Sequence, residues 1–379
     1  LGTYGIYYDE TYNPDPLDTT YNQVHIPGAN ARGTNFVAAG DEVYLVIGST
    51  CRVLDIATGE TLRTITLPPD PSTGERPNWG YLGVHGHLLI AGSRFVEFSG
   101  DDEEMENPWR DFDHSSSRRI VVMDRASGVV QWTRSAQHAF RHNAIAVCDG
   151  RLFAIDSLPH PVRVKLMMRG REPREDPTLM CLDLQTGETL WETDESVFGT
   201  WLGYSADHHI LLQGGRSSRD MLAGEPSERM IAYDGRTGDV IWDRDIKHSG
   251  PCMIHHDTVY LNAKYTEGSA ISLLNGKPVM RKHPLTGAEM PWRYHRTYGC
   301  NSVVASEHLL AFRSGAAGYY DLESDCGTGN LGGFKSGCTS NLIAANGVLN
   351  APDYTRTCVC SYQNQTSLAM IHDPEVELW

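Results

Sequence analysis

Short apolar runs, separated by turns rich in glycine, aspartate and asparagine, recur along most of this chain. The runs contain mainly Val, Ile, Leu and Tyr, and no long stretch keeps the period of about 3.6 residues that marks an amphipathic helix. The pattern therefore favours strands over helices. An apolar strand, a polar turn and a second apolar strand occur together seven times, at residues 36–44, 82–90, 144–153, 204–212, 253–260, 303–311 and 342–349.

A turn of the form Asp-x-x-Thr-Gly is the second repeated element, and a Trp follows eight positions after its Asp. The two complete copies run from Asp183 to Trp191 and from Asp234 to Trp242. Each turn is expected to join two strands, because Gly tolerates a positive φ and the Asp carboxylate accepts hydrogen bonds from the turn's backbone. We expect the Trp to pack between repeats, since one repeat cannot bury both faces alone. Incomplete copies begin at Asp55, Asp124, His283 and Asp321.

The spacing of the strand pairs predicts the architecture. Successive copies lie 45, 64, 58, 49, 50 and 39 residues apart, and a blade of four short strands needs about 40–45 residues. The sequence therefore predicts an all-β, seven-bladed β-propeller of four-stranded antiparallel blades, in which residues 35–379 form one domain. The long steps carry loop insertions near 94–118, rich in acidic residues, and 157–176, rich in basic residues. Residues 1–34 form an N-terminal extension that either closes the ring or continues from a further upstream region.

The residues around the complete turns resemble a known repeat. Segment 180–191, which reads Met-Cys-Leu-Asp-Leu-Gln-Thr-Gly-Glu-Thr-Leu-Trp, and segment 230–242 look like the tryptophan-docking repeats of pyrroloquinoline-quinone (PQQ)-like propellers. As a repeat pattern the resemblance covers residues 35–320, and the tail, 327–362, resembles large PQQ-like repeat proteins of planctomycete-type bacteria. That superfamily includes quinoprotein alcohol dehydrogenases and the BamB outer-membrane assembly scaffold, so the resemblance implies a fold more specifically than an activity.

The quinoprotein branch of this superfamily binds a quinone with Ca²⁺, beside a Trp and usually an adjacent Cys-Cys disulfide. This sequence has neither a Cys-Cys pair nor the Cys-x-x-Cys-His motif that attaches haem. The predicted blades are also fewer than such enzymes typically have. PQQ is therefore not expected as a cofactor, and a PQQ-dependent dehydrogenase is the least favoured function. A divalent metal ion, Ca²⁺ or Zn²⁺, is the one cofactor that the sequence leaves as an open alternative.

Composition narrows the range of partners. A net charge of −16 at pH 7 and a pI near 5.4 argue against nucleic acid and anionic membranes, because both would be repelled. The sequence contains no run of about 18 apolar residues, so a transmembrane helix is not expected. Nine cysteines are many for a cytosolic protein, so we expect an extracytoplasmic location, periplasmic or secreted. The first residues lack the order of a signal peptide, so a mature or trimmed form is expected.

The inner strands of a propeller converge on its axis, so the residues just before each inner strand are expected to ring one mouth of the channel. Amides and indoles at that mouth suit a sugar, because amides hydrogen-bond hydroxyls and indoles offer flat apolar faces. Alternatively, the Asn side chains bond the backbone of the turns that enter the strands. The predicted ligand-binding residues are Asn35, Trp79, Asn143, Trp201, Asn301 and Asn341, with His142, Ser249, Cys300 and Cys338 at equivalent positions.

Cleavage of a uronate-containing polysaccharide by β-elimination is the most concrete reaction that these residue types suggest. It needs a cation for the substrate carboxylate, a base for the C5 proton and an acid for the leaving oxygen. The candidate cations are Arg141, Arg296 and Arg356; the base is His142 or a Tyr; and the acid is Tyr298 or Tyr354. The rival hypothesis is a non-catalytic scaffold like BamB, which binds a protein partner through its loops.

Cysteines and paired histidines offer further chemistry. Four cysteines of the last two predicted blades are expected to form two disulfides, with a zinc or other thiolate site as the alternative. The pairs His208–His209 and His255–His256 are candidate bases or metal ligands. Neighbouring residues of a strand point to opposite faces, so neither pair is expected to place both imidazoles in one site. The four cysteines are Cys300, Cys338, Cys358 and Cys360.

Overall fold

The computed structural model of the chain describes residues 36–95, 116–158, 167–168, 170, 176–215, 226–262, 267–283, 285–297, 299, 303–331, 342–351 and 368–371. These residues form strands almost throughout, and Met167 and Met168 are the only helical residues among them. Within the same ranges no helix has the length and apolar character needed to cross a membrane.

The strands form antiparallel sheets, which we number as blades in chain order. The first blade contains β1 (Phe36–Ala39), β2 (Glu42–Ile47), β3 (Thr50–Asp55) and β4 (Thr61–Thr66). The second and third blades form one seven-stranded sheet of β5 (Trp79–His85), β6 (Leu88–Phe95), β7 (Ser116–Asp124), β8 (Val130–Cys148), β9 (Arg151–Asp156), β10 (Thr178–Asp183) and β11 (Thr189–Thr193). They share β8, whose N-terminal part pairs with β7 and whose C-terminal part pairs with β9.

The remaining blades are separate sheets. The fourth contains β12 (Trp201–Ser205), β13 (Ile210–Gly214), β14 (Arg229–Asp234) and β15 (Val240–Asp245), and the fifth contains β16 (Ser249–His255), β17 (Thr258–Asn262), β18 (Glu267–Ser272) and β21 (Arg293–His295). The sixth contains β22 (Val304–Ala305), β23 (Leu309–Ser314), β24 (Ala316–Asp321) and β25 (Thr328–Asn330). The seventh contains β26 (Ile343–Ala345), β27 (Val348–Ala351) and β28 (Leu368–Ile371).

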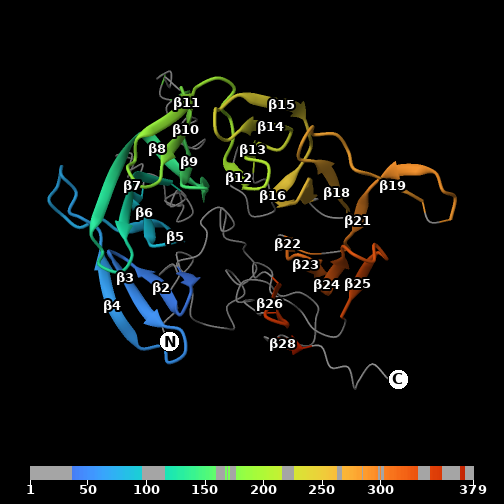
Figure 1. Cartoon of the computed structure of the whole chain (residues 1–379), viewed down its shortest axis with the longest axis horizontal. Helices are drawn as coiled ribbons and strands as arrows, with labels where there is room; N and C mark the ends of the chain where they lie inside the picture. The colour runs from blue at the N-terminus through green and yellow to red at the C-terminus, as the bar shows by residue number, and fades with distance from the viewer. Residues whose placement is uncertain are drawn as a thin grey trace.

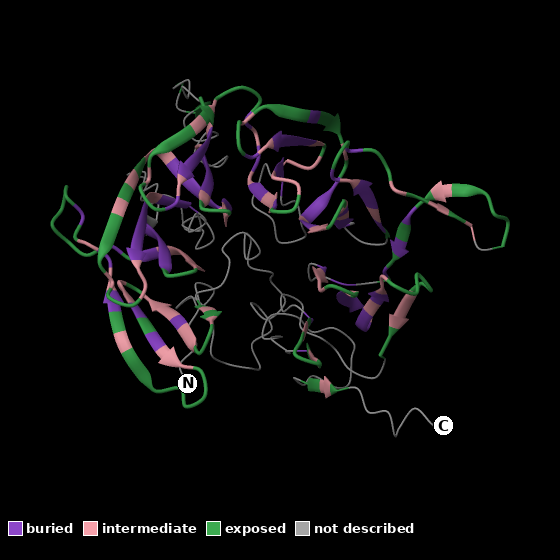
Figure 2. Cartoon of the chain, in the orientation of Figure 1, coloured by how far each residue is buried: buried purple, intermediate pink, exposed green. Residues whose placement is uncertain are grey.

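The blades follow one another around a common centre, from β1–β4 to β26–β28 (Figure 1). Each of six apolar clusters takes side chains from two consecutive blades. Leu88 and Ile90 of β6 join the cluster shared with the third blade, whereas Leu89 and Ala91 join the one shared with the first. The middle strands are thus buried on both faces, which explains their unbroken apolar runs. Outer strands such as β4 and β15 are largely exposed (Figure 2).

This architecture is the predicted all-β propeller of four-stranded antiparallel blades. The described strands are compatible with seven blades: six have four strands each, counting β8 in both of its blades, and the seventh has three among the described residues. The predicted insertions fall between β6 and β7 and between β9 and β10. Most of both insertions, and the predicted extension 1–34, lie outside the described residues.

The predicted packing of Trp residues between repeats is confirmed. The turns of the two complete copies each lie against a Trp of the preceding blade: a Cβ on Gly187 would come within 2.6 Å of the Trp132 ring, and one on Gly238 within 2.8 Å of the Trp191 ring. Turn and indole together therefore fix one blade against the next. The indole N–H donates to a backbone carbonyl of the next blade from Trp132 to Leu184 (2.9 Å), from Trp191 to Gly235 (3.0 Å) and from Trp242 to Leu273 (2.7 Å).

The turn predicted at His283 does not join two strands of a blade. It closes a hairpin of β19 (Met280–Lys282) and β20 (Glu289–Pro291), which projects from the ring (Figure 1). The turn equivalent to the other copies is at 272–277, where the Gly276 N–H donates to the Ser272 carbonyl (2.8 Å). The hairpin thus interrupts the outer strand of the fifth blade, which pairs with β18 before it at Val279 and after it in β21.

Candidate functional site

Of the predicted ligand-binding residues, the structure describes Trp79, Asn143 and Trp201. Trp79 opens β5 and Trp201 opens β12, and Asn143 lies where β8 becomes the inner strand of the third blade. All three therefore lie in the first part of an inner strand, whereas the sequence places them just before it. Outside the described residues lie Asn35, Asn301 and Asn341, the catalytic candidates Tyr298, Tyr354 and Arg356, and the disulfide candidates Cys300, Cys338, Cys358 and Cys360.

Trp79 and Trp201 are buried between blades. Trp79 is 2% exposed, and its indole N–H donates to the Ser49 carbonyl of the preceding blade (3.2 Å). Trp201 is 9% exposed and lies over Gly203, where an added Cβ would come within 2.6 Å of the indole. Both indoles contribute to the apolar contacts between blades, and a binding role for them stays a prediction.

His142 belongs to a buried polar cluster between the second and third blades. Its Nε2 lies 2.7 Å from Ser117 Oγ of β7, and its ring centroid lies 6.1 Å from that of Tyr81. Gly80 makes room for the pair, because a Cβ there would come within 3.0 Å of His142 Nε2 and closer still to Ser117 Oγ. Desolvation raises the pKa of Tyr81 to about 12, although its side chain is only partly buried, so the phenol is protonated at neutral pH.

Buried polar side chains recur at the end of the second strand of five blades. The Asp156 carboxylate accepts the backbone N–H groups of Gln137, His138 and Ala139 at 2.5, 2.9 and 2.8 Å. Gln213 and Ser314 likewise accept backbone N–H groups from the chain that enters the inner strands of the fourth and sixth blades. Polar side chains therefore do bond the backbone that enters these inner strands, and the same role for the predicted Asn residues stays a prediction. The sequence signal is a polar residue that closes an apolar run: Ser93, Asp156, Gln213, Asn262 and Ser314, all between 0% and 6% exposed.

The described catalytic candidates are enclosed within the blades. Arg141 and His142 are each 5% exposed, and Arg296 is 3% exposed. Arg141 and His142 lie together in β8, where its pairing with β9 is interrupted between Phe140 and Ile145. Arg296 follows β21 of the fifth blade, whereas Arg141 and His142 belong to the sheet of the second and third blades.

Histidines and carboxylates meet across blade boundaries at the turns between first and second strands. His208 Nε2 lies 2.6 Å from Asp257 Oδ1 of the fifth blade, and His209 Nδ1 lies 3.2 Å from Asp149 Oδ2 of the third. These two imidazoles therefore serve different partners, although both lie in the turn after β12 and not on the strand that the prediction assumed.

The corresponding prediction for His255 and His256 is wrong, because both imidazoles face the carboxylate of Glu307. The alternation of a strand does not apply to them. His255 ends β16, but His256 lies in the following turn with a φ of 49°, in the left-handed region. Sequence reasoning considers this pair but cannot foresee the backbone conformation that brings the two rings together.

Five cysteines in the described part of the chain are free thiols. The other four of the nine cysteines lie outside the described residues. Those four are the predicted disulfide candidates, whose pairing stays a prediction. The free cysteines are Cys51, Cys148, Cys181, Cys252 and Cys326.

Residues 48–312 match the family described as outer membrane protein assembly factor BamB. The crystal structure of BamB from Moraxella catarrhalis is similar to this chain with a TM-score of 0.47 and 14% identity, over 84% of this chain and 80% of that one. The crystal structure of the computationally designed Ika8 protein has a TM-score of 0.45 and 13% identity, over 89% of this chain and 95% of that one. Both similarities are distant, and no curated protein matches the chain significantly.

Proposed function

Because the chain belongs to the family described as outer membrane protein assembly factor BamB, we propose that it is a non-catalytic β-propeller scaffold that binds a protein partner. The description of the family concerns assembly at the outer membrane. It therefore also supports the expected extracytoplasmic location, which is part of this proposal.

The burial of the catalytic candidates is the observation that carries the proposal. A lyase needs a base that reaches the sugar ring and a cation that reaches its carboxylate. His142, Arg141 and Arg296 are at most 5% exposed, and Ser117, which lies against His142, is fully buried. Polar groups at the same end of the blades hold backbone N–H groups in place. This arrangement favours a framework over a substrate site.

The outer strands offer a surface that suits a protein. β4, β11 and β15 each end their sheet, so one edge of each is unpaired among the described strands. The second residue of each is an exposed apolar side chain: Leu62 is 53% exposed, Leu190 48% and Ile241 44%. An unpaired edge accepts a strand from a partner through backbone hydrogen bonds, and apolar side chains beside it add contact.

Two Lys substitutions test binding to these edges: one lies on an outer strand, and the matched control lies in a turn away from it. The purified chain captures its partner from a cell-envelope extract, and the dissociation constant is then measured with the purified partner. Leu190→Lys should weaken binding at least about tenfold, because the ammonium would be desolvated in the contact. Ala206→Lys adds the same charge to an exposed turn between β12 and β13 and should bind like the original chain. Equal affinities for both variants would contradict this docking surface.

A polysaccharide lyase is the second candidate, because Arg141 and His142 lie together on β8, in the sheet that carries both predicted insertions. The scaffold proposal predicts no cleavage of uronate-containing polysaccharides, followed by the ultraviolet absorbance of the unsaturated product. Cleavage that His142→Ala abolishes, while the variant keeps its fold, would replace the scaffold with the lyase.

A further inference from the structure

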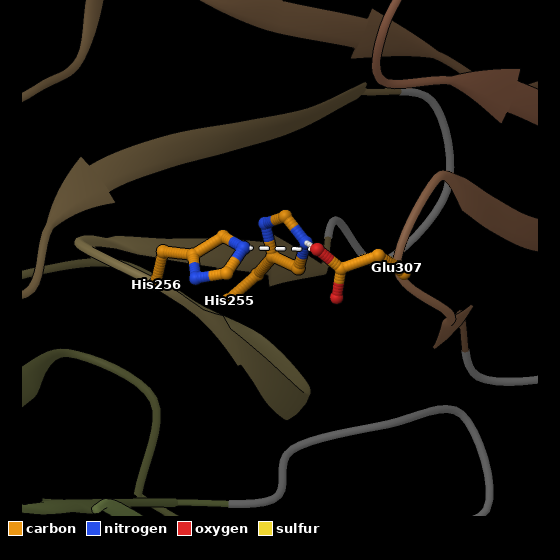
Figure 3. A group of neighbouring side chains, drawn as sticks. All are labelled: His255, His256 and Glu307. Atoms are coloured by element: carbon orange, nitrogen blue, oxygen red, sulfur yellow. Dashed lines mark hydrogen bonds and ion pairs between the residues drawn. The ribbon is translucent and has the colours of Figure 1, made fainter. Parts of the chain in front are cut away.

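Three side chains from two blades meet on the side of the propeller formed by the turns between first and second strands (Figure 3). His255 and His256 belong to the fifth blade, and Glu307 lies in the turn between β22 and β23 of the sixth. His256 Nε2 lies 3.0 Å from Glu307 Oε1, and His255 Nε2 lies 3.6 Å from the same oxygen. The potential ligand atoms all lie within 4.8 Å of one another.

The turn after β16 forms this arrangement. The left-handed backbone at His256 turns its ring to the same side as that of His255, and the two rings meet edge to face with centroids 4.3 Å apart. Asp257, the next residue, pairs with His208 of the fourth blade. Its carboxylate is thereby engaged elsewhere, and Glu307 is the acid that faces both imidazoles.

An ion pair between the imidazoles and Glu307 leaves one buried polar atom of the cluster without a hydrogen bond. His255 Nε2 is buried, yet no hydrogen bond to it forms among the described residues, and Glu307 Oε1 is too distant at 3.6 Å. A buried polar atom without a partner is costly, so an additional group between these atoms would stabilise them.

We infer that His255, His256 and Glu307 bind a zinc ion. In tetrahedral sites zinc lies about 2.0–2.2 Å from imidazole nitrogens and carboxylate oxygens, which separates two ligand atoms by about 3.3–3.5 Å. The two measured nitrogen–oxygen separations, 3.0 and 3.6 Å, lie on either side of that range. Two imidazoles select zinc or a similar transition metal over Ca²⁺ and Mg²⁺, which prefer oxygen ligands.

Three protein ligands leave the fourth position of the zinc ion for water or for a side chain of a partner. The side chains of His256 and Glu307 are 62% and 61% exposed, so solvent reaches the site. The ion would join the fifth blade to the sixth at their turns. This inference does not depend on the scaffold proposal, because zinc binding is measured without any partner.

Titrations of the metal-free full-length chain test the site. Zinc chloride is added in a calorimeter, and cobalt(II) chloride is added while visible absorption is recorded. We expect one site whose cobalt complex has the bands of tetrahedral nitrogen and oxygen coordination. His256→Ala and Glu307→Gln should each weaken zinc affinity at least about tenfold. His295→Ala, at a side chain that is 69% exposed outside the cluster, should leave the affinity unchanged.

Thermal denaturation without metal checks that the variants fold. We expect them to fold, because the substituted side chains are exposed. Zinc should raise the melting temperature of the original chain, and it should raise the melting temperatures of the two ligand variants less. Zinc affinity that neither ligand substitution changes would overturn the inference. So would a cobalt spectrum dominated by thiolate charge transfer, because it would assign the metal to cysteines.

Discussion

Single side chains determine how the chain enters the inner strands, and Asp156 is the clearest case. Its buried carboxylate accepts three backbone hydrogen bonds from the segment before the inner part of β8. Hydrogen bonds to a charged group are stronger than neutral ones. The apolar run before Asp156 predicts a buried strand, but its partners lie 17 to 19 residues earlier and no local pattern connects them.

We expect Asp156→Ala to lower the free energy of unfolding by about 2–4 kcal/mol, because it leaves three backbone N–H groups without their acceptor, that of the buried Ala139 among them. Asp194→Ala is the control, since Asp194 is an exposed acid after β11, and its effect should stay within about 0.5 kcal/mol. Urea unfolding followed by Trp fluorescence measures both. Similar stabilities for the two variants would show that Asp156 does not hold this segment.

The pair of Glu42 and Arg63 should make the stability depend on pH. Arg63 donates to both Glu42 oxygens, at 2.5 and 2.9 Å, and lowers the pKa of Glu42 from 4.5 to about 2. The stabilisation is complete above the unfolded pKa and is lost as pH falls from 4.5 towards 2. Because the pair is partly exposed, we expect Glu42→Gln to cost about 1–2 kcal/mol at neutral pH.

Urea unfolding at neutral pH and at about pH 2, near the pKa of Glu42 in the folded chain, measures the difference in stability between the original chain and Glu42→Gln. The gap between the original chain and Glu42→Gln should close at the lower pH. Glu60→Gln, at an exposed acid next to β4, should match the original chain at both values. A gap that persists at low pH would mean that the ion pair is not its cause.

At the scale of elements, the Thr-Gly turn at Gly187 stabilises the fold through its contact with the preceding blade. Gly59 and Gly187 have nearly the same φ, 72° and 74°, but only Gly187 lies against a Trp ring. Gly59→Ala should therefore cost about 1–2 kcal/mol for the left-handed backbone alone. Gly187→Ala should cost about 1–3 kcal/mol more, because its methyl group would displace Trp132. Equal losses in urea unfolding would show that the contact contributes nothing.

The strands were predictable because burial on both faces gives unbroken apolar runs, such as Leu88–Ala91 in β6 and Leu179–Leu182 in β10. The interrupted outer strand of the fifth blade was not. The motif at His283 fits the turn pattern better than the true turn at 272–277, and both form a turn with the same hydrogen bonds. Local sequence therefore specifies the turn, whereas pairing with β18 decides which turn belongs to the blade.

At the scale of the whole molecule, the fold was predictable and the site only in part. The repeat specifies which faces are buried, and six clusters between blades follow from it. The cluster of His255, His256 and Glu307 depends on a turn conformation and on a residue 51 positions away. Neither is encoded in the repeat, so the sequence indicates candidate histidines but not their partner.

The blade cores should also protect thiols. Burial raises the pKa of Cys51, Cys181 and Cys252 to about 12, so these thiols should not react with a disulfide reagent at neutral pH until the chain unfolds. Cys326 is exposed and should react at once. Thiol counting should show that Cys326→Ser removes one rapid equivalent, whereas Cys181→Ser removes none. If Cys181→Ser also removed one rapidly reacting thiol, the contact between the third and fourth blades, in which Cys181 is buried, would have to open readily.

β8 runs without a turn from the outside of the second blade to the inside of the third. A force that pulls on the chain therefore finds no linker at which to separate these two blades. Peeling the second blade away loads the strand that anchors the third, so we expect the two blades to rupture together. The propeller is modular in its repeats, but mechanically these two blades are one unit.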